Sequence, residues 1–120
     1  MNFKNVPILK RLYPSIVRRY LMLIGKFKIN IMINNFVFEI DIRESIERKT
    51  YFLREYEKKR MEQLQLYSKE NESEIFIDVG ANIGFYSILL SNDFDQIFSF
   101  EPHNRNFLVL IKNIDKNKLK

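Results

Sequence analysis

Two acidic residues and a pair of glycines stand at a spacing that could bind a nucleotide-containing cofactor. Asp78 precedes the turn Val79-Gly80-Ala81-Asn82-Ile83-Gly84. Glu101 is the first residue after the next apolar run. Glycine lets the backbone approach a ligand closely, and a carboxylate about 20 residues further on can accept hydrogen bonds from both ribose hydroxyls. The chemistry predicted at this point of the chain is the binding of an adenosine-containing cofactor.

A purely structural interpretation competes with this one. Glu101 would then only cap a helix that begins near Asn104, and Gly80 and Gly84 would only make a turn. Either feature alone favours that interpretation. Because both occur together at the spacing of a nucleotide site, the sequence favours ligand binding.

The residue types in the turn indicate which cofactor. Asn82 stands where a dinucleotide loop has its middle glycine, and Asp78 would repel a diphosphate. An acid suits instead the ammonium and sulfonium groups of S-adenosylmethionine, and Asn tolerates the left-handed backbone of such a loop. We expect Asp78 to face the amino-acid end of S-adenosylmethionine and Glu101 its ribose. The predicted cofactor-binding residues are Asp78, Gly80, Ala81, Asn82, Gly84 and Glu101.

The elements that must position these residues form a βαβα series. Residues 75–79 and 96–100 are short apolar runs, and residues 83–90 and 104–114 have helical patterns. Such a series predicts a parallel sheet with a right-handed crossover. The nearly continuous apolar run of residues 75–79 further predicts a strand buried on both faces.

The preceding residues predict a different set of elements. Residues 8–28 favour a helix, and residues 27–33 and 36–42 alternate as a hairpin around Asn34-Asn35. Residues 43–68 contain no Pro or Gly and favour helix, with a possible break near Thr50. The polar run 68–73 marks a boundary, so we expect a cap region over residues 1–72 and a cofactor-binding region over residues 73–120.

One segment resembles the FkbM family of S-adenosylmethionine-dependent methyltransferases. The resemblance lies in residues 76–87, Phe76-Ile77-Asp78-Val79-Gly80-Ala81-Asn82-Ile83-Gly84-Phe85-Tyr86-Ser87, in Phe100-Glu101-Pro102, and in a helix ending in Asn113. It implies a class I Rossmann-like α/β fold and O-methylation of a hydroxyl on a sugar or metabolite. The implied partner is a small-molecule or glycan methyl acceptor.

The sequence departs from that family in the number of strands. A class I methyltransferase sheet has seven strands, whereas only the first two and their helices are found here. We therefore expect an incomplete Rossmann-like fold, an N-terminal part with little activity alone.

Two other functions stay open. A non-catalytic remnant or interaction module would pair with another copy through an exposed sheet edge. A fragment of an NAD-dependent oxidoreductase would use the same glycine turn, although Asn82 and Asp78 speak against it.

Composition excludes several other classes of site. The sequence has no cysteine and a single histidine, His103, so disulfides, thiolate zinc sites and histidine metal clusters are excluded. The absence of a long apolar stretch and of a secretory signal predicts a cytoplasmic protein.

The positive charge is concentrated at the N-terminus. Residues 1–28 contain seven basic residues and no acid, whereas residues 29–120 contain the other 13 basic residues and all 15 acids, a net charge of 13 − 15 = −2. This asymmetry argues against a nucleic-acid partner. The basic N-terminal arm is expected to pack on the body as a helix with a solvated basic side. Alternatively it could lie weakly on an anionic membrane surface.

Overall fold

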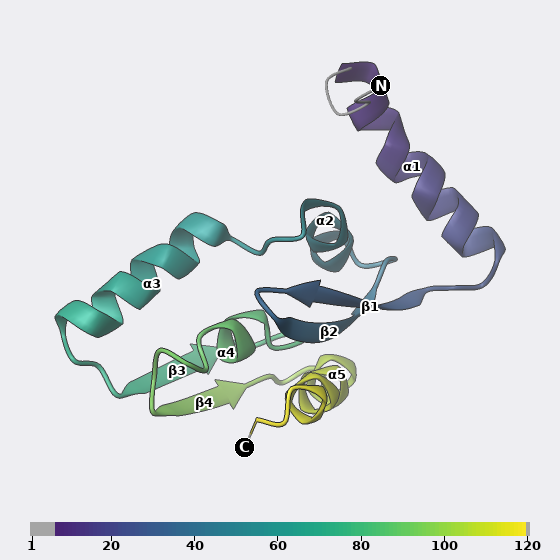
Figure 1. Ribbon diagram of the computed structural model, residues 1–120. Helices are drawn as coiled ribbons and strands as arrows, with labels where there is room; N and C mark the ends of the chain where they lie inside the picture. The colour runs from purple at the N-terminus through teal and green to yellow at the C-terminus, as the bar shows by residue number, and fades with distance from the viewer. Residues whose placement is uncertain (1–6, 120) are drawn as a thin grey trace.

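The described part of the chain has a mixed α/β structure with two separate two-stranded sheets (Figure 1). The computed structural model describes residues 7–119. Its elements in chain order are α1 (Pro7–Leu23), β1 (Lys28–Ile33), β2 (Phe36–Asp41), α2 (Ser45–Leu53), α3 (Lys58–Glu70), β3 (Ile75–Val79), α4 (Phe85–Leu89), β4 (Gln96–Phe100) and α5 (Asn104–Lys116).

The predicted hairpin is confirmed. β1 and β2 pair antiparallel, with Lys28 opposite Asp41 and Ile33 opposite Phe36. Asn34 and Asn35 join them with positive φ angles of 47° and 70°. Two successive left-handed residues match the twist of a hairpin, and Asn tolerates that geometry.

The helical segment predicted over residues 43–68 forms two helices, and the break expected near Thr50 lies later, at residues 54–57. Arg54 ends α2 in a left-handed conformation, with φ 56°, and its backbone N–H donates to the carbonyl of Thr50. Glu57 is also left-handed, with φ 39°. The two bends let Tyr56 stack on Phe85, with ring centroids 4.3 Å apart. Tertiary packing of an aromatic ring therefore breaks a segment of high helix propensity.

The predicted βαβα series is confirmed in order and direction. β3 and β4 pair parallel, with Ile75 beside Gln96 and Val79 beside Phe100. The helix between them is shorter than predicted, because Ile83 and Gly84 still belong to the turn. The coarse prediction of an α/β chain with a parallel sheet thus holds for the described residues.

The prediction that the strand over residues 75–79 is buried on both faces is wrong. Ile75, Ile77 and Val79 are exposed, and Val79 keeps 80% of its accessible surface. Asp78, on the other face, is buried. The parallel sheet has two strands in residues 7–119, and α4 packs on the face that carries Asp78, so the second face stays open.

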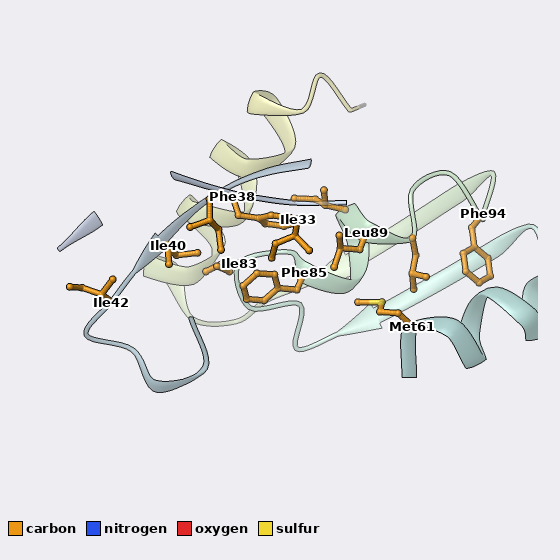
Figure 2. Packing of buried hydrophobic residues seen from close by; sticks show 12 residues of the cluster. Ile33, Phe38, Ile40, Ile42, Met61, Ile83, Phe85, Leu89 and Phe94 are labelled. Carbon is orange, nitrogen blue, oxygen red and sulfur yellow. The ribbon is translucent and has the colours of Figure 1, made fainter. Parts of the chain in front are cut away.

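The hydrophobic core joins the hairpin to the glycine turn and α4 (Figure 2). Phe38 of β2 packs against Phe85 of α4, with ring centroids 5.0 Å apart. The other buried members from these elements are Ile31, Ile33, Ile40, Ile83, Ile88 and Leu89, and Leu90 directly after α4 joins them. Residues on both sides of the boundary expected at residue 72 therefore share one hydrophobic cluster.

Candidate functional site at the glycine turn

The turn between β3 and α4 is hydrogen-bonded to the end of β4. The backbone N–H groups of Gly80 and Ala81 both donate to the carbonyl of Phe100, at 2.8 and 3.1 Å. Gly80 and Gly84 have φ angles of 84° and 92°, and Asn82 between them has φ 52°. The left-handed geometry expected of Asn82 is confirmed, and the turn lies at the edge where both parallel strands end.

Glu101 lies beside this turn. Its Oε2 accepts a hydrogen bond from the backbone N–H of Asn82 at 2.7 Å. Its Oε1 accepts from the backbone N–H of His103 at 2.8 Å, and the side chain is half-buried. The structure therefore brings Glu101 together with Gly80, Ala81 and Asn82, since one carboxylate links the loops that follow β3 and β4.

The two glycines face different surroundings. A Cβ atom built on Gly80 would meet no atom within 4 Å, whereas one on Gly84 would lie 2.5 Å from Cδ1 of Leu110. Gly84 thus allows α5 to pack closely against the turn. Gly80 leaves its side of the turn open, as backbone contact with a ligand requires.

Asp78 occupies a buried polar cluster. It is 7% exposed, and its Oδ2 accepts a hydrogen bond from the hydroxyl of Ser87 at 2.6 Å. The Ser87 and Ser99 hydroxyls lie 2.7 Å apart. Asp78 therefore already has a partner on the side of the sheet that α4 covers. Its expected contact with the amino-acid end of a cofactor stays a prediction.

The sequence interpretation missed Ser87 and Ser99. Ser99 is the register partner of Asp78 across the parallel sheet, and Ser87 lies in α4 above both strands. The available signal was a polar residue inside each of two apolar runs. Buried carboxylates need such hydrogen-bond partners, because an unpaired one is costly to desolvate.

Asn113 of α5 holds the turn to the hairpin and was not expected to do so. Its side chain is fully buried, its Nδ2 donates to the carbonyl of Ile83 at 2.9 Å, and its Oδ1 accepts from the backbone N–H of Glu39 at 2.7 Å. One amide thus satisfies backbone groups of two elements. The sequence signal was that Asn106, Asn113 and Asn117 recur at helical spacing on the side of α5 that carries Leu110.

Tyr86 presents a polar group from α4 next to the turn. Its hydroxyl donates to the carboxylate of Glu57, whose other neighbour is the guanidinium of Arg60 at 3.1 Å. Burial, followed by the hydrogen bond to Glu57, raises the pKa of Tyr86 to about 12. The hydroxyl therefore stays protonated at neutral pH and acts as a donor rather than as a base.

A second charged cluster lies where β2 ends and α2 and α5 begin. The Arg105 guanidinium contacts carboxylate oxygens of Asp41 and Glu44, each at 2.8 Å. Hydrogen bonds from Arg43 lower the pKa of Asp41, whereas burial raises the pKa of Glu47 to about 7. Both Asp41 oxygens are occupied by these partners, so this cluster joins three elements and serves a structural role.

Two further classes of feature were searched for in the described part of the chain. Among residues 7–119, no three His, Cys, Asp or Glu side chains gather closely enough to hold a metal ion. No helix there has both the length and the apolar character needed to cross a membrane.

Comparison with known proteins yields no match. No protein-family model, curated protein or solved structure is similar enough to this chain to match it. The resemblance carried by residues 76–102 therefore stays a prediction, and the functional argument depends on the residues described above.

Proposed function

We propose that the chain binds S-adenosylmethionine at the carboxyl ends of β3 and β4, as the cofactor-binding part of an FkbM-like O-methyltransferase with a Rossmann-like fold. The observation that carries this proposal is the 2.7 Å hydrogen bond between Glu101 and the backbone of Asn82. It keeps a carboxylate next to the glycine turn. Ligands of parallel α/β sheets bind at this edge.

The residues at the turn fit the adenosyl part of such a cofactor. Each oxygen of Glu101 accepts one backbone hydrogen bond and has a lone pair left for a ribose hydroxyl. The open side of Gly80 leaves room for a ligand to approach the backbone. Asp78 fits less directly, since Ser87 already binds its carboxylate.

When bound, S-adenosylmethionine supplies an electrophilic methyl group. Transfer of this methyl group to a hydroxyl oxygen would leave the neutral thioether S-adenosylhomocysteine, and the hydroxyl proton would pass to solvent. This reaction depends mainly on in-line positioning of the acceptor. We propose that residues of the turn and Glu101 hold the cofactor. The small-molecule or glycan acceptor and the cytoplasmic location stay predictions.

A second candidate function is that of an interaction module. It is favoured by the open face of the parallel sheet, whose exposed apolar residues are Ile75, Ile77, Val79, Phe98 and Phe100. Unpaired strand edges and exposed apolar patches favour association with another chain. This candidate predicts self-association and no binding of S-adenosylmethionine.

Isothermal titration with S-adenosylmethionine and NAD, each added to the whole chain, tests the proposal. We expect heat with the first ligand and none with NAD. Glu101→Ala should weaken binding about 10- to 100-fold, because a hydrogen bond to a charged group is lost. The matched control is Glu70→Ala, which removes an exposed carboxylate from α3.

Circular dichroism spectra of both variants must match the parent chain, because Glu101 also links two loops. No heat with S-adenosylmethionine, together with a sedimentation coefficient that rises with protein concentration, would support the interaction module instead. Heat with NAD alone would support the oxidoreductase.

A further inference from the structure

The first helix exposes a continuous apolar stripe. Leu12, Ile16, Tyr20 and Leu23 recur at helical spacing along α1 and are 50%, 63%, 60% and 81% exposed. At 100° per residue these four side chains lie within one side of the helix. Exposed apolar side chains scattered singly are ordinary, but a row of four on one helix indicates a surface that binds something.

Only one side of α1 packs against the rest of the chain. Val17 and Leu21 are half-buried, and Tyr13 meets Phe52 of α2 edge to face, with ring centroids 6.1 Å apart. Figure 1 shows α1 running away from the two sheets. The expected packing of the N-terminal helix on the body is therefore partial, and the stripe from Leu12 to Leu23 lies outside it.

Charge indicates the kind of partner. Arg18 and Arg19 are exposed on α1, and Lys26 follows in the connection to β1. Residues 1–28 have no acidic side chain to offset their seven basic ones. A second copy would offer a body of net charge −2 with both signs interspersed, whereas an anionic lipid surface offers phosphates of one sign.

We propose that α1 lies on an anionic lipid surface, with its apolar stripe at the acyl boundary and Arg19, at the margin of that stripe, at the headgroups. A basic amphipathic helix with aromatic residues binds such surfaces through buried apolar area and attraction to anionic lipids. Tyr20, within the stripe, has the apolar ring and polar tip favoured at that boundary. Arg19 lies about 60° from Ile16 around the helix, at the margin of the stripe, where its long side chain can reach phosphates, whereas Arg18 lies on the opposite side and adds positive charge.

Co-sedimentation of the whole chain with lipid vesicles tests this proposal. One set contains phosphatidylcholine alone, and the other contains equal parts of phosphatidylcholine and phosphatidylglycerol. We expect binding to the mixed vesicles only, and weaker binding as salt concentration rises. Arg18→Gln with Arg19→Gln should weaken it roughly 30-fold, whereas Lys59→Gln with Lys69→Gln, which removes the same charge from α3, should not.

A second pair of variants tests the stripe. Ile16→Glu with Leu23→Glu should abolish vesicle binding, whereas Leu66→Glu, on the exposed side of α3, should leave it unchanged. Circular dichroism checks that the helices persist. Equal binding to both kinds of vesicle, or unchanged binding of the Ile16→Glu, Leu23→Glu variant, would overturn the proposal.

One further outcome would also overturn it. The chain could bind neither kind of vesicle and instead form a dimer that the Ile16→Glu, Leu23→Glu variant does not form. The apolar stripe of α1 would then bind a second copy of the chain. None of these residues belongs to the glycine turn. Failure here is therefore distinguishable from failure of the proposed cofactor binding.

Discussion

The two small sheets of this chain distribute polar and apolar residues in opposite ways. The hairpin β1–β2 buries Ile31, Ile33, Phe38 and Ile40 on the face that meets the core. The parallel sheet β3–β4 instead directs Ile77, Val79 and Phe100 into solvent and keeps Asp78 inside. The apolar face of the hairpin is therefore covered by the core. The apolar face of the parallel sheet has no cover in the described residues.

The difference assigns separate roles to the two regions. The hairpin contributes to the free energy of folding through its packing on Phe85, and it positions the glycine turn through Asn113. The parallel sheet provides the edge where Glu101 binds the backbone of Asn82 and Gly80 binds that of Phe100. We infer that substitutions on the hairpin side will change stability most. Substitutions on the open face will change association more than stability.

The largest effect is expected at the contact between the two regions. Phe85→Ala removes a buried ring that packs on both Phe38 and Tyr56, and should lower the free energy of unfolding by about 3 to 5 kcal/mol. Urea denaturation followed by circular dichroism measures the change. Phe100→Ala, on the open face, is the control and should cost less than about 1 kcal/mol. Similar losses for the two variants would contradict the comparison.

Substitution of the two glycines of the turn should also lower stability to different extents, more at Gly84 than at Gly80. Gly84→Ala combines a left-handed backbone with a clash against Leu110, so we expect a loss of roughly 2 to 5 kcal/mol in unfolding free energy. Gly80→Ala has the backbone strain but no neighbour, and should cost about 1 to 2 kcal/mol. Thermal unfolding of both variants tests this order, and a larger cost at Gly80 would refute the view that its surroundings are open.

The pH dependence of stability should originate on the hairpin side. Glu47 is buried and accepts a hydrogen bond from the backbone N–H of Asp41, and burial raises its pKa from 4.5 to about 7. The folded chain thus holds this proton more tightly than the unfolded chain. Its contribution is full below about pH 4.5 and is lost as pH rises through about 7, a decrease of roughly 2 to 3 kcal/mol in unfolding free energy.

Urea titrations of the parent chain and of Glu47→Gln across this pH interval measure that dependence. The amide cannot lose a proton, so the variant should lack this decrease. Glu70→Gln, an exposed change on α3, should keep it. An unaltered slope in Glu47→Gln would mean that another group titrates.

The smallest change in stability is expected at the most exposed residue of the open face. Val79→Ser should alter the unfolding free energy by less than about 0.5 kcal/mol, because Val79 is 80% exposed. If the open face pairs with another copy, the same variant should sediment as a smaller species at high protein concentration. Sedimentation velocity of parent and variant compares the two, and an unfolded variant would show that Val79 contributes to the core.

Local patterns predicted most of the elements. The alternation around Asn34-Asn35 specified the hairpin, and the bounds of β3 and β4 match those expected from their apolar runs. The helix break was misplaced, because helix propensity favours continuity where Tyr56 must instead reach Phe85. Glu101 was predicted near the glycine turn and lies there, whereas the bond from Ser87 to Asp78 was missed, since its one signal was a polar residue within an apolar run.

The sequence by itself determined the order of the elements, their periodicity, the left-handed turns at Asn34-Asn35 and Asn82, and the concentration of basic charge at the N-terminus. These properties depend on residues that are close together in the sequence. Only the tertiary structure decided which face of each strand is covered, which carboxylates are already paired and which side of α1 stays exposed. Burial and pairing depend on residues distant along the chain, and periodicity alone does not encode those contacts.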